Sequence, residues 1–241
     1  MTQKRLAILG ATGSIGCSTL DLVRQHPDRF KVIALSANTQ GNKLFEQCLE
    51  FRPEVVVMGD DKEAKTLQDR LNQKNINVEV LTGASELLTL VQLPHVDIVV
   101  SAIMGAAGLR STLAAARAGK TILLANKESL VMTGNLLLQE AKKHGAILLP
   151  VDSEHNAIFQ CMPPNYTCGV RPVGVRRILL TASGGPFFKL SSHDLDKVTP
   201  EEAINHPNWR MGKKISVDCA TLMNKGLELI EACLLFSMTP D

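Results

Sequence analysis

The chain has 241 residues, of which 45% are hydrophobic and 21% are charged, and its formal net charge is +2. These values are ordinary for a globular protein, and they give no reason to expect nucleic acid or an anionic membrane as a partner. The sequence holds no apolar run of membrane-spanning length, and its first apolar run, which stops at Gly10, is too short for a signal peptide. Six cysteines at scattered spacings favour reduced thiols, so we expect a cytoplasmic protein of one large or two smaller domains.

The first predicted element is a strand from Lys4 to Leu9, followed by glycines at positions 10, 13 and 16 and an amphipathic helix to about Gln25. Glycines at this point permit a tight turn and let backbone N–H groups approach a pyrophosphate at the helix N-terminus. Glycines also serve ordinary turns, but the position between a strand and a helix is the one that a dinucleotide site requires. The sequence therefore predicts a nucleotide-binding loop.

The second predicted strand, 31–36, is followed by Asn38, Thr39 and Gln40 rather than by an acidic residue. A carboxylate at this point binds the ribose 2′-hydroxyl of NAD and would repel the 2′-phosphate of NADP. Its absence therefore favours NADP. Lys43 is a candidate partner for that phosphate, although a lysine on a surface helix is more often simply solvated.

Strands and helices then alternate as far as residue 151. Further strands are predicted at 54–58, 78–81, 97–101, 121–124 and 146–151, and helices at 41–51, 62–74, 84–91, 107–118 and 128–143. This alternation indicates a parallel sheet with helices on both faces, a doubly wound α/β fold. In such a sheet ligands lie outside the carboxyl ends of the strands, where the loops 102–105 and 125–128 fall.

Lys127 lies in the second of these loops, at the predicted start of a helix. The helix dipole disfavours a cation at that end. An anionic ligand or a pair with Glu128 would explain its position, and an ordinary surface charge is the alternative.

Two carboxylates follow the seventh predicted strand. Asp152 and Glu154 are two residues apart, which on an extended chain places both side chains on one face. Two like charges so close repel each other, so either one carboxylate takes up a proton or a cation lies between them. Such oxygen ligands suit Mg²⁺ or Mn²⁺, whereas a solvated turn is the alternative.

The remaining sequence is predicted to contain two more strands, 177–181 and 214–217, separated by a long polar segment. Thr199 is expected to cap one short helix within it. A connection of this length is usually a functional lid or disordered. It holds Trp209, the only tryptophan, which either closes over a ligand or anchors the loop to the core.

A final helix is predicted at 219–236, with Asp218 as its N-cap. Asn224, Lys225 and Glu228 share one side of this helix. Glu228 is a candidate third carboxylate for a metal, and the other two are donors suited to a phosphate. A salt bridge between Lys225 and Glu228 is the alternative. A different face is predicted to pack into the core and comprises Leu222, Ile230 and Leu234.

Five motifs occur in order along the chain: GATGSIG at 10–16, LANKES at 124–129, VDSEHN at 151–156, TASGGP at 181–186 and MNKGLE at 223–228. Together they resemble the 1-deoxy-D-xylulose 5-phosphate reductoisomerase family from end to end of the chain. The combination is far more specific than any single motif. The resemblance implies conversion of a small phosphorylated sugar, 1-deoxy-D-xylulose 5-phosphate, to 2-C-methyl-D-erythritol 4-phosphate in isoprenoid biosynthesis. It also implies NADPH and a divalent cation (Mg²⁺, Mn²⁺ or Co²⁺) as cofactors.

The resemblance assigns roles to individual residues. The catalytic residues it implies are Lys127 and the three metal ligands Asp152, Glu154 and Glu228. The substrate-binding residues it implies are Ser153, Glu154, Ser183, His206, Asn224, Lys225 and Glu228. Within a segment that resembles a flexible flap, about 183–213, lie His206, Trp209 and Met211. The NADPH site it implies comprises Gly10, Thr12, Gly13, Ser14, Ile15, Asn38, Gln40, Ala102, Gly105, Asn126, Glu128 and Gly212.

Family members continue well past Asp241, so the resemblance implies that the chain is a fragment of a homodimeric protein. It implies a Rossmann-type NADPH-binding domain at 1–150 and a second α/β catalytic domain, incomplete at its C-terminal end, at 151–241. The sequence departs from the family pattern at 38–40, where Gly-Lys/Arg/Ser-Asn is common, and at Cys219, where serine is common.

Two other functions remain open from the sequence. One is a different NADP-dependent enzyme, such as a semialdehyde dehydrogenase, which would need a nucleophilic cysteine where the chain has Asp152 and Glu154. The other is a non-catalytic module that binds the cofactor.

Overall fold

The computed structural model describes residues 3–205 and 212–240. The chain divides into two compact units, unit 1 (Met1–Asp152) and unit 2 (Ser153–Asp241). In the described residues, no helix combines the length and the apolar character that a membrane span requires.

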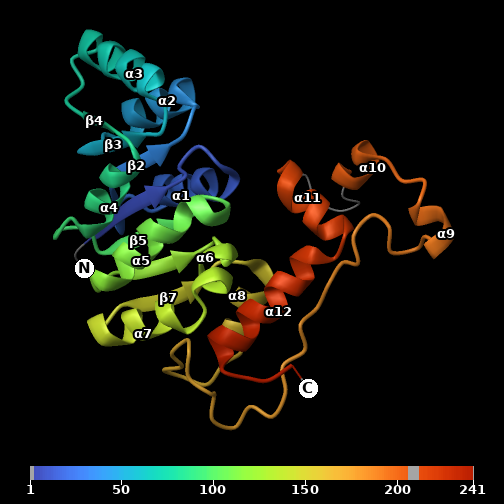
Figure 1. Ribbon diagram of the computed structural model, residues 1–241. Coiled ribbons are helices and arrows are strands. Elements are labelled where there is room, and N and C mark those ends of the chain that lie inside the picture. Colours follow the sequence, from blue (N-terminus) through green and yellow to red (C-terminus); the bar gives the residue numbers. More distant parts are fainter. Residues whose placement is uncertain (1–2, 206–211, 241) are drawn as a thin grey trace. The chain divides into compact units, whose positions relative to one another are not determined.

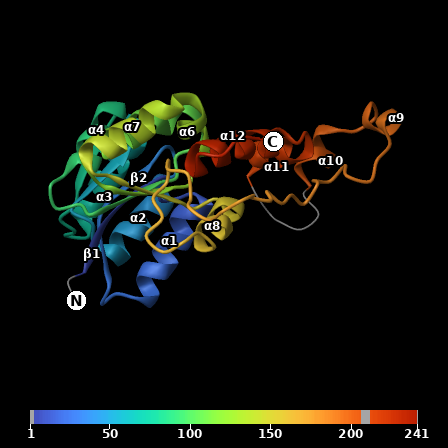
Figure 2. The ribbon, with the colours of Figure 1, turned by 90° about the horizontal axis from the view of Figure 1, so that it is seen from below.

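Unit 1 is built on a seven-stranded parallel sheet in the order β4-β3-β2-β1-β5-β6-β7. Its strands are β1 (Lys4–Leu9), β2 (Phe30–Ala37), β3 (Val55–Met58), β4 (Glu79–Thr82), β5 (Ile98–Ser101), β6 (Thr121–Leu124) and β7 (Ile147–Pro150). Its helices are α1 (Ser14–Gln25), α2 (Gly41–Phe51), α3 (Asp61–Gln73), α4 (Ala84–Gln92), α5 (Leu109–Arg117), α6 (Lys127–Thr133) and α7 (Asn135–His144), with a 3-10 turn η1 (Gly105–Gly108). Helices α1 and α2 lie on one face of the sheet, and α4 and α7 on the other (Figures 1 and 2). The predicted doubly wound α/β fold is confirmed.

The strands of unit 1 were predictable because most are buried on both faces. All four residues of β3 are buried, as are the last four of β1. Strands covered on both sides appear in a sequence as continuous apolar runs. The helix expected at 128–143 is instead two helices, because Gly134 adopts φ +53° and separates α6 from α7.

The chain reverses direction across the sheet between β1 and β5. It runs outward from β1 to β4 and then returns to place β5 against the free side of β1. At this switch point the loops after β1 and β5 touch. Gly10 has φ +79°, and a Cβ there would lie 2.7 Å from the carbonyl oxygen of Ala102. Glycine is required at this position by both backbone conformation and space.

The opposite ends of β1 and β5 are joined by an ion pair. Asp97 accepts hydrogen bonds from the Arg5 backbone N–H at 2.8 Å, from Nε at 3.1 Å and from Nη2 at 3.0 Å. Hydrogen bonding by the Arg5 side chain lowers the pKa of Asp97 from 3.8 to about 2. The pair therefore fixes β1 against β5, the two strands that flank the switch point.

Unit 2 consists of helices and irregular segments in its described part. Its helices are α8 (Ser153–Gln160), α9 (Ser192–Leu195), α10 (Pro200–Ile204), α11 (Lys213–Ala220) and α12 (Met223–Phe236). Thr199 caps α10 with a capping box, as predicted. A small aromatic core holds this unit together, in which Phe236 of α12 stacks on Tyr166 and on His155 of α8.

Two predicted strands of unit 2 are wrong. Residues 214–217 lie in helix α11, where the Ser216 hydroxyl donates to the Gly212 carbonyl one turn earlier. A four-residue alternation is too short to separate a strand from a helix. Residues 177–181 form no strand, and the described part of unit 2 offers them no strand to pair with.

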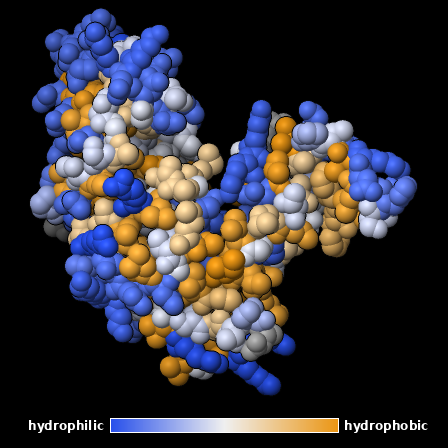
Figure 3. All heavy atoms as spheres, viewed as in Figure 1, coloured by the Kyte–Doolittle hydropathy of each residue, from blue (hydrophilic) through white to orange (hydrophobic). Residues whose placement is uncertain are grey.

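The final predicted helix is interrupted. Asp218 lies inside α11 instead of capping a helix, and Leu222, with φ +60°, separates α11 from α12. The expected core face of α12 is also wrong, because Leu222 is 55% exposed and Ile230 is 47% exposed. Figure 3 shows apolar side chains on the visible surface along α12. The buried face comprises Asn224, Glu228, Glu231, Ala232, Leu235 and Phe236.

The Arg5–Asp97 pair predicts a pH dependence of stability. Because the pKa of Asp97 falls from 3.8 to about 2 on folding, its stabilising contribution is present above the unfolded value and is lost as the pH falls toward 2. Urea unfolding across this range should show a shallower decline of stability for Asp97→Asn than for the wild type. Asp28→Asn, at an exposed turn, is the control. Identical pH slopes in all three proteins would contradict the assignment.

The contact at Gly10 predicts that an alanine there destabilises the protein by more than the strain of its left-handed backbone alone. Gly145 has a similar φ of +69°, but a Cβ there meets nothing within 4 Å. Gly145→Ala should cost about 1–2 kcal/mol of unfolding free energy for the left-handed conformation. Gly10→Ala should cost about 1–3 kcal/mol more, because its methyl group also meets the Ala102 carbonyl. Equal losses in denaturant titrations would show that the two loops do not touch.

Candidate active site

The N-terminus of α1 is open to an anion. No side chain caps this helix at Gly13, and its first turn holds no acidic residue. By contrast, α3 is capped by Asp60, which accepts from the Glu63 N–H at 2.9 Å. Gly13, Ser14 and Ile15 are exposed. The first N–H groups of a helix and its dipole together favour a phosphate at this end.

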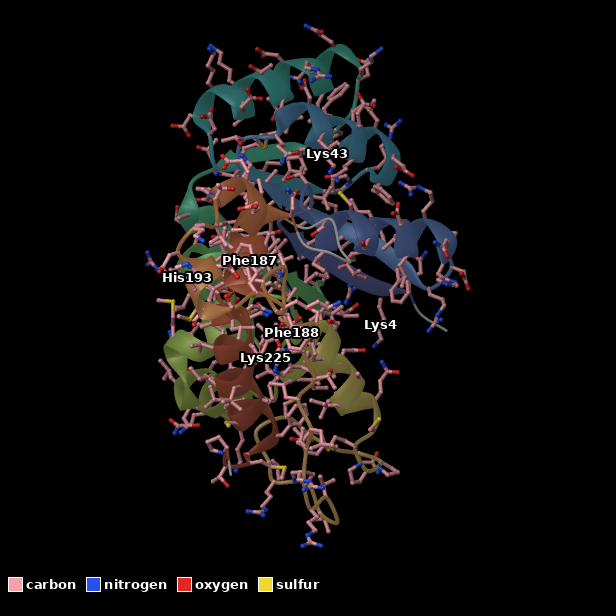
Figure 4. The ribbon with its side chains drawn as sticks, turned by 90° about the vertical axis from the view of Figure 1, so that its right-hand side faces the viewer. Lys4, Lys43, Phe187, Phe188, His193 and Lys225 are labelled. Carbon is pink, nitrogen blue, oxygen red and sulfur yellow. The ribbon has the colours of Figure 1, made fainter. Side chains whose placement is uncertain are left out.

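The loop after β2 lies beside this helix start. Asn38, Thr39 and Gln40 are exposed, and Gln40 makes no side-chain cap to α2. Lys43, labelled on α2 in Figure 4, donates from Nζ to the carbonyl oxygen of Thr12 at 2.8 Å. One contact leaves two N–H groups of a lysine ammonium for other acceptors. Lys43 thus brings a positive charge to the glycine loop.

Asn126 connects the loops after β5 and β6. Its Nδ2 donates to the carbonyl oxygens of Ile103 and Gly105, and its Oδ1 caps α6 by accepting from the Ser129 N–H at 2.6 Å. It is 2% exposed. These contacts give Asn126 a structural role in shaping this edge of the sheet. Of the other expected cofactor contacts here, Ala102, Gly105 and Glu128 are all partly exposed.

Lys127 forms an ion pair with Asp152 at the end of unit 1. Its side chain is buried, so it is not an ordinary surface charge. The cation at the start of α6 is therefore balanced by a carboxylate that follows β7.

Glu154 does not lie on an extended chain. Helix α8 begins at Ser153, so Glu154 sits in its first turn, and the shared strand face expected for Asp152 and Glu154 is wrong. Asp152 directly precedes α8, and aspartate is a residue type that favours the start of a helix. The Ser153 hydroxyl donates to Glu154 Oε2 at 2.6 Å.

The charged centre of unit 2 is the Lys225 ammonium on α12 (Figure 4). It donates to Glu154 Oε1 at 2.9 Å, to Glu228 Oε2 and to the Thr181 carbonyl at 2.5 Å. Glu228 is 1% exposed, and its Oε1 accepts from Asn224 Nδ2 at 2.5 Å. The salt bridge between Lys225 and Glu228, the alternative left open by their spacing, is present.

Charge is retained in this cluster despite its burial. Burial lowers the pKa of Lys225, but hydrogen bonds to Glu228 and Glu154 outweigh that effect, so the pKa is raised overall. Burial raises the pKa of Glu154, and hydrogen bonds from Ser153 and Lys225 lower it overall. The hydrogen bonds between the ammonium and the carboxylates therefore keep Lys225 and Glu154 in their charged forms.

The donor set fits a divalent cation. Glu154 and Glu228 each offer a carboxylate oxygen, and these atoms lie within 4.8 Å of each other. Carboxylate oxygens are the ligands that Mg²⁺ and Mn²⁺ prefer. Two carboxylates this close already require a positive charge, which Lys225 supplies here.

Sequence reasoning missed His155 and Glu231. His155 is fully buried, its Nε2 donates to the Glu228 carbonyl oxygen at 2.9 Å, and its Nδ1 lies 3.6 Å from Glu231 Oε2. His155 thereby holds α8 against the turn of α12 that carries Glu228. The signal was present, since the polar residues Asn224, Glu228 and Glu231 recur at the spacing of one helix face.

The remaining predicted residues lie on the loop after Thr181, at helix α11 or outside the described residues. Ser183 is exposed on a loop, where its hydroxyl accepts from the Gly185 N–H at 3.4 Å. Gly212 is the exposed N-cap of α11. His206, Trp209 and Met211 fall outside the described residues. Cys219 lies in the last turn of α11 rather than at a helix N-terminus.

Two family models match the chain. Residues 6–134 match 1-deoxy-D-xylulose 5-phosphate reductoisomerase, and residues 148–236 match the C-terminal domain of the same family. The 1-deoxy-D-xylulose 5-phosphate reductoisomerase of Methylococcus capsulatus is 59% identical over 240 residues, which is 99% of this chain and 61% of that protein.

Solved structures agree with these matches. A DOX-P reductoisomerase in complex with NADPH, fosmidomycin and magnesium superposes with a TM-score of 0.91 at 48% identity, covering 98% of this chain and 59% of that one. The Zymomonas mobilis enzyme in complex with NADPH gives a TM-score of 0.87 at 46% identity, covering 99% of this chain and 59% of that one. The chain thus spans about 60% of the length of the curated relatives it matches. It belongs to the 1-deoxy-D-xylulose 5-phosphate reductoisomerase family.

Proposed function

We propose that this protein rearranges 1-deoxy-D-xylulose 5-phosphate and reduces the product to 2-C-methyl-D-erythritol 4-phosphate, using NADPH and a divalent cation. The observation that carries the proposal is the pair of carboxylates, Glu154 and Glu228, held within 4.8 Å of each other around a positive charge. Relatives from this family, solved with NADPH, fosmidomycin and magnesium, support it.

The proposed metal ligands are Asp152, Glu154 and Glu228. Asp152 precedes Ser153 directly in the chain and pairs with Lys127, so a carboxylate is fixed immediately before α8. When bound, a divalent cation would supply Lewis acidity toward the substrate's carbonyl and adjacent hydroxyl oxygens. Mg²⁺, Mn²⁺ and Co²⁺ all accept such ligands.

The other polar residues are proposed to bind and orient the sugar phosphate. Lys127 and Ser153 are donors toward its hydroxyl oxygens, and Ser183, Asn224 and Lys225 are donors toward its phosphate. His206 would act with them from the flap, about 183–213. The phosphate does not react, and its binding energy serves to position the reacting carbons.

The domain at 1–150 is proposed to bind NADPH, and the one at 151–241 to carry the reaction. The bare N-terminus of α1 supports this, as does the exposed loop after β2 without a carboxylate. From the glycine loop the dinucleotide would extend along the exposed loops after β2 and β5. Gly212 would contact the cofactor from the catalytic domain.

A cytoplasmic location and a homodimer are also part of the proposal. All six cysteines are free, which suits a reducing compartment.

The alternative function, a semialdehyde dehydrogenase, gains no support. The residues after β7 are a carboxylate and helix α8 rather than a nucleophilic thiol.

The metal assignment predicts the behaviour of Glu228→Gln. This variant should keep the fold and its affinity for NADPH, because Glu228 lies outside unit 1. Its affinity for Mn²⁺, measured by electron paramagnetic resonance, should fall by more than about a hundredfold, since an inner ligand matters more than its supporting shell. Glu201→Gln, at an exposed position of α10, is the control. Unchanged Mn²⁺ binding in Glu228→Gln would remove Glu228 from the ligand set.

The cofactor assignment predicts a preference for NADPH over NADH. Lys43→Met should weaken NADPH binding by about tenfold, the value of one hydrogen bond to a charged group, and leave NADH binding unchanged. Lys62→Met, at an exposed position of α3, serves as the control. Fluorescence titration of each reduced cofactor gives both affinities. If Lys43→Met lowered the affinities for NADPH and NADH by the same factor, Lys43 would not bind the 2′-phosphate.

A further inference from the structure

The Lys225 ammonium has all three of its N–H groups engaged. They point to Glu154 Oε1, to Glu228 Oε2 and to the Thr181 carbonyl oxygen, and an ammonium has no further donor. Asn224, the neighbouring donor expected at the phosphate, likewise donates to Glu228. In this arrangement Lys225 serves the carboxylates and has no N–H group left for a phosphate.

The same two carboxylates are the proposed metal ligands. A cation between them relieves their mutual repulsion, and a divalent ion does so more strongly than an ammonium. An ammonium and a metal ion cannot occupy the space between one pair of oxygens at the same time. A metal ion bound to Glu154 Oε1 and Glu228 Oε2, the oxygens that Lys225 now contacts, would therefore exclude the lysine from them.

We propose that Lys225 and the divalent cation are alternative partners of Glu154 and Glu228, so that cation binding releases Lys225 to hold the substrate's phosphate. This inference rests on the proposed function, because it takes the two carboxylates as metal ligands. It adds an order to binding: the cation comes first, and the phosphate site is completed by the ammonium that the cation displaces.

The surroundings of Lys225 allow this exchange. Its side chain is 23% exposed, whereas that of Glu228 is 1% exposed, so the lysine is the partner with room to move. Glu228 is held in place by Asn224 and by the hydrogen bond of His155 to its carbonyl oxygen. The third acceptor of Lys225, the Thr181 carbonyl, belongs to the same loop as Ser183. The released ammonium would thus start beside another residue proposed to bind the phosphate.

The exchange couples the two ligands by linkage. If the cation frees the donor that the phosphate needs, the cation strengthens phosphate binding, and phosphate strengthens cation binding by the same factor. Replacing Lys225 should remove this coupling and also raise the intrinsic affinity for the cation, because the internal competitor is gone.

The direct test is the accessibility of the Lys225 amine to an acetylating reagent, followed residue by residue by mass spectrometry. Saturating Mg²⁺ should increase its labelling by about tenfold, the factor of one lost hydrogen bond between charged groups. Inorganic phosphate added with Mg²⁺ should protect it again, and phosphate alone should not. Lys62, exposed on α3, is the internal control in each digest.

A second measurement compares Mn²⁺ affinity in two variants. Lys225→Met should bind Mn²⁺ about tenfold more tightly than the wild type. Lys214→Met removes the same charge from α11, where Lys214 pairs with Asp218 at 2.8 Å, and should change the affinity little. Equal gains in both variants would indicate a general charge effect and would overturn the exchange.

The outcomes separate the inference from the proposed function. If Mn²⁺ binds and depends on Glu228, but Lys225 labelling does not respond to Mg²⁺, the exchange is wrong and the metal site stands. If Mn²⁺ binding is absent, or is independent of Glu228, the proposed function fails and the inference falls with it.

Discussion

Repulsion between two neighbouring carboxylates, the buried Glu228 and the half-buried Glu154, is the constraint on which unit 2 depends. Glu154 enters from the first turn of α8 and Glu228 from the buried face of α12, and the Lys225 ammonium satisfies both. Removing the partner of a buried charge leaves that charge uncompensated, so the buried Glu228 needs another cation wherever Lys225 leaves it. Two carboxylates this close bind a cation in either state of the site. They attract a divalent metal ion more strongly than an ammonium, because its charge is higher.

In unit 1, polar loops lie at one edge of a sheet whose core is apolar. The reversal of strand order between β1 and β5 places them there, and Gly10 lets the two loops touch. The bare start of α1 and the contact of Lys43 with Thr12 then give this edge a positive character. The phosphate binding proposed here would rest on backbone geometry, with few specialised side chains.

The sequence predicts unit 1 well and unit 2 poorly, for physical reasons. Strands buried on both faces, such as β3, leave continuous apolar runs, and all seven were found. In α12 the buried face carries Glu228 and Glu231 while Ile230 is exposed, so hydrophobicity pointed to the wrong side. The spacing of Lys225 and Glu228 allowed both a salt bridge and a ligand site. Only the position of Glu154, 71 residues earlier, shows that the bridge belongs to a larger cluster. His155 was missed because its partners lie on another helix.

The metal site and the exchange of Lys225 are both tested by anomalous diffraction from crystals of this protein grown with Mn²⁺. We expect one strong peak coordinated by Asp152, Glu154 and Glu228, with the Lys225 ammonium moved away from both glutamates. A peak at other residues, or crystals in which Lys225 still bridges Glu154 and Glu228 at saturating Mn²⁺, would contradict this expectation.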